Sequence, residues 1–197
     1  MKKNIVFILL FAGTASFAQH FELGAKAGVN ISNFIGASNS ADFKAKTYIG
    51  FHAGGFISLF VGDNFAIQPE VLFSAQGAKI EQTGSSSSDN YKLDYLVIPV
   101  MLKYRFTGGF YVEAGPQVGF KLNEKIDGTT QDFAKSTDLS VGAGLGYHSP
   151  IGLGIGARYV AGLSKVGDYK VSTTTPDWKN SAITISVFYT LFNNHRK

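Results

Sequence analysis

The chain has 197 residues, 18 Lys and Arg against 14 Asp and Glu, and no cysteine. A chain of this length fits one domain, and the lack of cysteine excludes disulfides, thiolate metal sites and a cysteine nucleophile. No run of five to eight basic residues is present, so no nucleic-acid partner is expected.

The first 18 residues have the layout of a secretory signal peptide. Lys2 and Lys3 precede an apolar run, IVFILLFA, and the segment Ser16-Phe17-Ala18 supplies the small residues of a cleavage site. The apolar run is far shorter than the roughly 20 residues that a spanning helix needs. We therefore predict a signal peptide over residues 1–18 and a mature domain over residues 19–197, in which 16 basic and 14 acidic residues leave a net charge of +2.

The mature chain reads as eight runs in which apolar and less apolar residues alternate. In the first run the odd positions are apolar, and the even positions carry Glu, Gly, Lys or Asn. Such alternation indicates a half-buried strand, because successive side chains of a strand point to opposite faces. The predicted strands span residues 21–31, 48–60, 65–78, 91–106, 110–122, 138–148, 151–163 and 181–192.

The connections between these runs alternate between long and short. Transmembrane barrels have short periplasmic turns and long extracellular loops. We therefore predict an all-β fold, an eight-stranded antiparallel up-and-down transmembrane β-barrel with periplasmic termini. The short connections are 61–64, 107–109 and 149–150, and the four long, polar ones are 32–47, 79–90, 123–137 and 164–180.

Alternation alone does not say whether the apolar face points into a soluble core, as in a lipocalin-like barrel, or out into lipid. A water-facing surface would use Thr, Lys or Glu rather than glycine, whereas a narrow eight-stranded lumen has room for few large side chains. Glycines therefore mark the inside, and the Phe, Leu, Ile and Val face points into lipid. The apolar face has only Gly55, and the less apolar face has Gly24, Gly28, Gly50, Gly54, Gly115, Gly119, Gly142, Gly144, Gly146, Gly152, Gly154, Gly156 and Gly162.

Aromatic residues gather near the strand ends that adjoin the short turns, as in the interfacial girdle of a membrane protein. The expected girdle residues are Phe21, Phe60, Phe65, Phe106, Phe110, Tyr147, Tyr189 and Phe192.

Four segments resemble the PorT-like outer-membrane β-barrel domain family, whose members are often labelled "porin family". They are GAKAGVN at 24–30, PEVLFS at 69–74, YLVIPVMLKY at 95–104 and GPQVG at 115–119. The resemblance covers about residues 20–192, and the proline-centred motifs are its most specific part. It implies an outer-membrane location, a barrel resembling the OmpA transmembrane domain, and no enzyme activity.

Strand parity places a mixed set of acidic and basic residues in the lumen. Buried charges are costly unless they are paired, so we expect a network of salt bridges and hydrogen bonds. The network could be a gate or narrow ion path, or a polar plug, and the crowded interior of eight strands favours the plug. The residues are Glu22, Lys26, His52, Glu70, Lys103, Arg105, Glu113, Lys121 and Arg158, together with Gln117.

No catalytic, cofactor or metal site is expected. His20, His52, His148 and His195 have no spacing that would bring two of them onto one metal, and no His has a Ser or Asp at matched depth for catalysis. The glycine pattern at 152–156 lies inside a predicted strand with no following helix, which argues against phosphate binding.

The sequence therefore predicts a non-enzymatic integral outer-membrane barrel with a structural, accessory or interaction role through its four long extracellular loops. A narrow porin-like channel for ions or small solutes is the alternative, and a lipid-modifying barrel enzyme is less favoured. The expected partners are outer-membrane lipid and lipopolysaccharide, the barrel-assembly machinery during biogenesis, and surface or secretion-system proteins.

Overall fold

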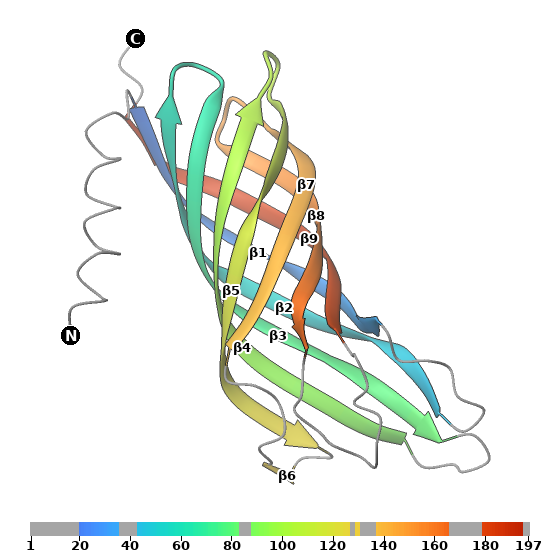
Figure 1. The fold of residues 1–197 in the computed structure, drawn as a ribbon. Helices are drawn as coiled ribbons and strands as arrows, with labels where there is room; N and C mark the ends of the chain where they lie inside the picture. The colour runs from blue at the N-terminus through green and yellow to red at the C-terminus, as the bar shows by residue number, and fades with distance from the viewer. Residues whose placement is uncertain are drawn as a thin grey trace.

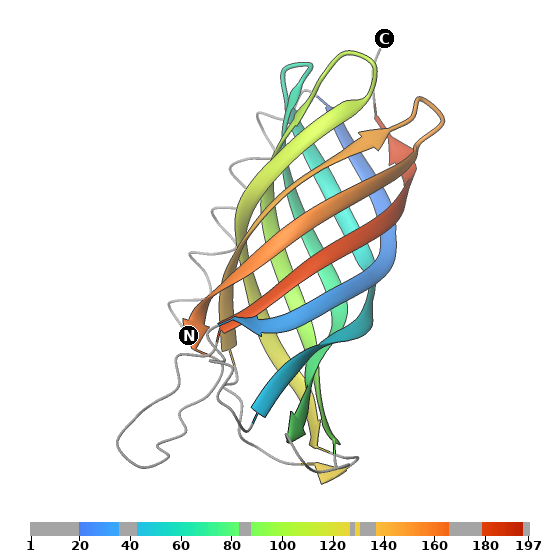
Figure 2. The same ribbon diagram turned by 90° about the vertical axis from the view of Figure 1, so that its right-hand side faces the viewer.

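The computed structural model describes residues 20–35, 43–82, 88–126, 129–130, 137–165 and 179–194. They form one antiparallel sheet that closes on itself into a barrel (Figures 1 and 2). The predicted signal peptide lies outside the described residues. Within these ranges, no helix has the length and apolarity needed to cross a bilayer.

The strands follow one another around the barrel in chain order, and β1 pairs with β9 to complete the ring. Eight of the strands are the eight predicted ones, which confirms the fold. The additional β6 is a two-residue strand on the edge of β5, inside a segment predicted as a loop. The strands are β1 (His20–Ile35), β2 (Phe43–Val61), β3 (Phe65–Gln82), β4 (Ser88–Arg105), β5 (Phe110–Ile126), β6 (Thr129–Thr130), β7 (Thr137–His148), β8 (Leu153–Lys165) and β9 (Lys179–Asn193).

Strands β2, β3, β4 and β5 run past their predicted ends on the side of the long connections, where they project beyond the other strands (Figure 1). The register shifts between Thr47 and His52 in the β2–β3 ladder, and between Asp94 and Tyr95 in the β4–β5 ladder. A bulge inserts a residue and so shifts the phase of the alternation. A strict period of two therefore ends the predicted strands near these shifts, at residue 48 in β2 and at residue 122 in β5.

The turn between β7 and β8 is longer than predicted. Gly152 has a φ of 86°, in the left-handed region that favours glycine, and its N–H donates to the Ser149 carbonyl at 3.0 Å. Ile151 and Gly152 therefore belong to the turn, and Gly152 is not a lumen glycine as its parity suggested.

Large apolar side chains cover the outer face of the described strands, as predicted. Leu145, Ile155 and Val187 are each more than half exposed, in positions that alternate with buried ones. Phe60 departs from the expected girdle, since it is only 1 % exposed and stacks on His20 inside the barrel, with ring centroids 4.1 Å apart. In β2 the even positions point inward, so parity, and not aromatic character, decides where Phe60 lies.

The lumen glycines leave space for a small aromatic core. Phe56, Tyr111 and Phe188 are buried together inside the barrel, and the rings of Phe56 and Phe188 meet edge to face at 5.8 Å. A Cβ atom at Gly24 would overlap the Phe56 ring, one at Gly154 the Phe188 ring, and one at Gly146 or Gly156 the Tyr111 ring. The glycines on β1, β7 and β8 thus accept rings that come from β2, β5 and β9.

Gly146→Ala is expected to lower the free energy of unfolding by about 1–3 kcal/mol, because overpacking forces neighbours to move. The added methyl would collide with the Ile155 carbonyl across the ladder and with the Tyr111 ring. Gly55→Ala is the matched control, since its Cβ would point outward and meet only the Gly24 carbonyl oxygen at 3.5 Å. Urea unfolding in lipid vesicles measures the free energy of unfolding of both variants. Equal losses of stability would show that the lumen glycines are not needed to leave space for neighbouring side chains.

Candidate functional site: the polar lumen

The charged lumen residues come from strands on opposite sides of the barrel. Lys103 on β4 lies directly opposite Glu113 on β5. Arg158 on β8 is separated from Glu113 by β7, where Gly144 occupies the intervening position. Because glycine has no side chain, the guanidinium crosses above β7 to the carboxylate on β5.

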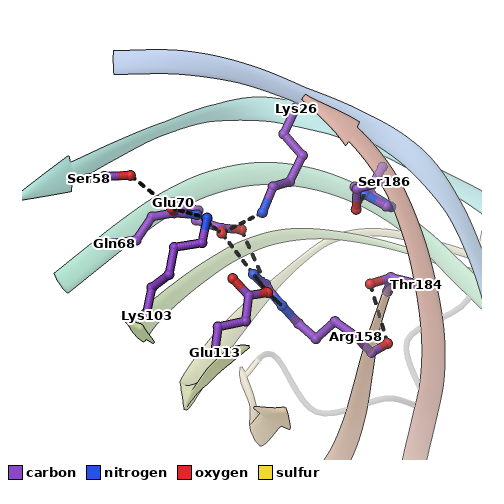
Figure 3. Close-up of polar contacts among 10 residues, drawn as sticks. Lys26, Ser58, Gln68, Glu70, Lys103, Glu113, Arg158, Thr184 and Ser186 are labelled. Carbon is purple, nitrogen blue, oxygen red and sulfur yellow. Dashed lines mark hydrogen bonds and ion pairs between the residues drawn. The ribbon is translucent and has the colours of Figure 1, made fainter. Parts of the chain in front are cut away.

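A central cluster forms around Glu70, whose side chain is fully buried (Figure 3). Lys26 Nζ donates to Glu70 Oε1 at 2.6 Å, and Arg158 donates to both Glu70 oxygens at 2.8 and 3.2 Å. Arg158 Nε and Nη2 also contact Glu113 Oε1, at 2.8 and 2.7 Å. Four predicted residues, from β1, β3, β5 and β8, are therefore joined by ion pairs across the lumen.

Lys103 joins this cluster through Gln68, a residue that the sequence analysis did not include. Lys103 Nζ donates to Gln68 Oε1 at 2.9 Å, and Gln68 Nε2 donates to Glu70 Oε1 at 2.7 Å. The Lys103 ammonium also lies 3.9 Å from the centre of the Tyr111 ring, which is cation–π geometry. Gln68 shares the parity of Glu70 on β3, so parity alone could have placed it in the lumen beside Glu70.

A second cluster lies toward the short turns. Arg105 donates to both oxygens of Glu22, at 2.9 and 2.7 Å. His148 lies beside them, with Nε2 3.1 Å from the Thr190 hydroxyl and Nδ1 3.8 Å from the Glu22 carboxylate. These residues line a cavity of about 460 Å³ at the short-turn mouth of the barrel. His148 is thus a buried member of the site, although the sequence analysis placed it only at the end of a predicted strand.

A third cluster, on the side of the long connections, centres on His52. Its ring nitrogens lie 2.7 Å from Asn30 Oδ1 and 2.9 Å from the Ser186 hydroxyl. The Asn30 amide in turn donates to the Ser74 hydroxyl at 3.0 Å and to the Ala75 carbonyl at 3.1 Å. A cavity of about 30 Å³ adjoins this cluster, which is room for one water molecule.

The remaining predicted residues are Gln117 and Lys121. Gln117 is buried and lines the small cavity with Lys26 and Arg158. Lys121 is half-buried and lies on β5 opposite Tyr95, nearer the long connections.

Comparison with known proteins identifies the class of barrel. Residues 17–168 match the family described as outer membrane protein beta-barrel domain. The chain belongs to this family. It is therefore an outer-membrane protein, as the outward apolar face predicted, and no relative is found among curated protein sequences.

Two solved outer-membrane barrels have a similar fold. Neisserial surface protein A is 14 % identical with a TM-score of 0.53, over 86 % of this chain and 97 % of that chain. The attachment invasion locus protein Ail of Yersinia pestis, in complex with the heparin analogue sucrose octasulfate, is 18 % identical with a TM-score of 0.52, over 86 % and 97 %. At these identities the likeness shows the fold alone.

In this outer-membrane barrel, packed side chains fill the lumen between the two cavities. Tyr111, Met101, Lys103, Gln68 and Glu70 are all fully buried in that layer. An eight-stranded barrel leaves an interior just wide enough for side chains, so the layer spans its cross-section. Among the described residues, no three His, Asp or Glu side chains converge as a metal site.

Proposed function

We propose that the protein is a closed, non-enzymatic barrel that anchors an interaction surface in the outer membrane. In this arrangement the long connections and the projecting ends of β2–β5 face the cell exterior, and the short turns face the periplasm. The interior serves stability rather than transport, and partners are engaged outside the lipid band. On the two proline-centred motifs, we place the chain in the PorT-like branch of the family.

The observation that carries this proposal is the ion-pair layer around Glu70. Conduction needs sites that an ion can enter and leave. Here the carboxylate of Glu70 is occupied by Lys26, Arg158 and Gln68, and the aromatic core closes the layer from the side of the short turns. An ion entering the lumen would have to break several buried contacts at once.

A narrow channel is the second candidate, because a cavity lies on each side of the layer. Planar-bilayer recording of the purified protein separates the two functions. We expect a silent barrel, and discrete current steps from the wild-type protein would overturn the proposal in favour of the channel.

The interaction surface has its own test, photo-crosslinking in living cells. A crosslinking amino acid at Ala45 or Ile80, in the projecting ends of β2 and β3, is expected to capture envelope or surface proteins. The same probe at Val187, on the outward face of β9, is expected to capture none because lipid surrounds it. If the Ala45 and Ile80 probes capture no protein, the interaction role fails.

A further inference from the structure

The cavity at the short-turn mouth of the barrel has the size of a small-molecule site. Its volume is about 460 Å³, and such sites span roughly 300–1,000 Å³. The turns between β4 and β5 and between β7 and β8 form its rim. The polar side chains of its floor are Glu22, Arg105, His148 and Thr190. A ligand in this cavity would contact charged side chains at its inner end and turn residues at its outer end.

Arg105 presents its guanidinium to the cavity. The Phe60 ring packs against this guanidinium, with Arg105 Cζ 4.8 Å from the centre of the ring, and Phe60 does not itself line the cavity. A guanidinium has five N–H donors, and Arg105 uses two of them for the oxygens of Glu22. Further donors therefore remain on a side chain that Glu22 and Phe60 hold in place and that is 19 % exposed.

The corner between Arg105 and His148 has more hydrogen-bond donors than acceptors. Arg105 Nε and His148 Nδ1 are buried and have no hydrogen-bond partner in the described part of the chain. His148 Nδ1 carries a proton when the Thr190 hydroxyl, 3.1 Å from Nε2, donates to that nitrogen. The Glu22 carboxylate is 3.8 Å from Nδ1, beyond hydrogen-bond range. Because an unsatisfied buried donor costs free energy, a ligand that brings acceptors would stabilise this corner.

The charge inside the barrel favours an anion of one charge as that ligand. The mouth cluster and the central cluster together contain four cations and three carboxylates, which are Lys26, Lys103, Arg105 and Arg158 against Glu22, Glu70 and Glu113.

Lys103 is the cation in excess, since its ammonium donates to the amide oxygen of Gln68 and not to a carboxylate. This ammonium lies 5.1 Å from the centre of the Phe188 ring, which also contacts His148 of the cavity floor. A monoanion at the mouth would balance the excess charge. A dianion would add a second negative charge beside Glu22, where like charges repel.

We propose that the mouth cavity binds a small monocarboxylate through Arg105. The two oxygens of a carboxylate match the planar fork of a guanidinium. A short apolar part of the ligand would lie against Pro150, Ile151 and Leu191, which also line the cavity. This binding goes beyond the interaction role proposed above, and in the orientation given there the ligand enters from the periplasm.

The test is isothermal titration calorimetry of the protein purified from outer membranes in detergent. Butyrate is compared with butyramide, a neutral molecule of nearly the same shape. We expect butyrate to bind about tenfold more tightly or more, since a hydrogen bond to a charged group is the stronger one. Equal affinities would overturn the proposal. Binding of inorganic phosphate without binding of butyrate would overturn it as well.

The variant E22Q tests the sign of the charge effect. It removes the negative charge beside Arg105 and keeps an amide oxygen that accepts a hydrogen bond, so it is expected to bind butyrate about fivefold more tightly. The matched control is D63N, which makes the same change of charge on the exposed turn between β2 and β3, away from the cavity. D63N is expected to change the affinity less than about twofold. An affinity of E22Q no higher than that of D63N would contradict the proposal.

The double variant E22Q/R105Q removes the whole ion pair, so neither partner is left as an unpaired buried charge. It is expected to bind butyrate and butyramide equally, and gel mobility shows whether the barrel is folded. A preference for butyrate that survives in the folded double variant would place the carboxylate elsewhere and overturn the proposal. Bilayer recordings of the same samples test the closed barrel separately, because binding at the mouth does not require conduction.

Discussion

Glu70→Ala is expected to lower the free energy of unfolding by about 3–5 kcal/mol, the cost of removing one partner from a buried ion pair. Glu70 accepts hydrogen bonds from Lys26, Arg158 and Gln68, so its removal leaves two cations in the lumen without their shared carboxylate. Arg158 keeps Glu113, but Lys26 loses its ion-pair partner in the described part of the chain. Urea unfolding in lipid vesicles, followed by circular dichroism and gel mobility, measures the loss.

The control for this variant is Glu22→Ala, which breaks the ion pair at the mouth. The Arg105 side chain is 19 % exposed and borders the mouth cavity, where water can solvate the freed guanidinium. We expect a smaller loss of about 1–2 kcal/mol. A larger loss for Glu22→Ala than for Glu70→Ala would show that the central cluster does not stabilise the barrel.

A double-mutant cycle tests whether the cluster acts as a unit. Glu70→Ala and Arg158→Ala remove opposite charges that contact each other, so the double variant is expected to lose less than the two single losses combined. Additive losses would mean that the ion pair contributes nothing beyond each side chain's own packing.

The fold was predictable because two properties of the chain are local. Alternation along each strand depends on neighbours two residues apart, and the loop lengths are read directly between the runs. The position of Lys26, Glu70 or Arg158 inside the barrel follows from parity alone. The far ends of β2 and β5 were missed for the same reason, since the register shifts after Thr47 in β2 and after Lys121 in β5 interrupt the period that reveals a strand.

The pairing of charges inside the lumen was not predictable in this way. Arg158 reaches Glu113 only because the residue between them on β7 is Gly144, which depends on the register of three strands. The aromatic core was hidden as well, because Phe56 and Phe188 occupy lumen positions where polar residues were expected. A ring can lie there only where a glycine on another strand leaves space, as Gly154 does for Phe188.

The buried rings that fit beside these glycines help to keep the lumen closed. Phe188 lies between the polar cluster at the mouth and the central cluster around Glu70. The centre of its ring is 5.3 Å from the centre of the His148 ring on one side and 5.1 Å from the Lys103 ammonium on the other. The Tyr111 ring is 6.1 Å from Phe188 in an edge-on arrangement. These two rings separate the mouth cavity from the charged layer around Glu70.

Tyr111→Ala combined with Phe188→Ala is therefore expected to open the mouth cavity as far as the charged layer. The loss of two buried rings should destabilise the barrel by more than the roughly 3–5 kcal/mol of a single Phe→Ala change. The bilayer recordings are therefore made at or below the temperature at which the bacterium grows. In planar bilayers we expect current steps that the wild type does not show. The lumen would then be lined by Lys26, Lys103, Arg105 and Arg158 against Glu22, Glu70 and Glu113, an excess of one positive charge that favours anions.

Phe120→Ala is the matched control, because this ring is 41 % exposed on the outer face and its loss leaves the lumen untouched. It is expected to remain silent. If the double variant folds, as gel mobility would show, and is also silent, the ion pairs around Glu70 close the barrel without help from the rings. If it conducts with anion selectivity, the aromatic core is the barrier, and the glycines that accept its rings are what allow eight strands to close around a filled interior.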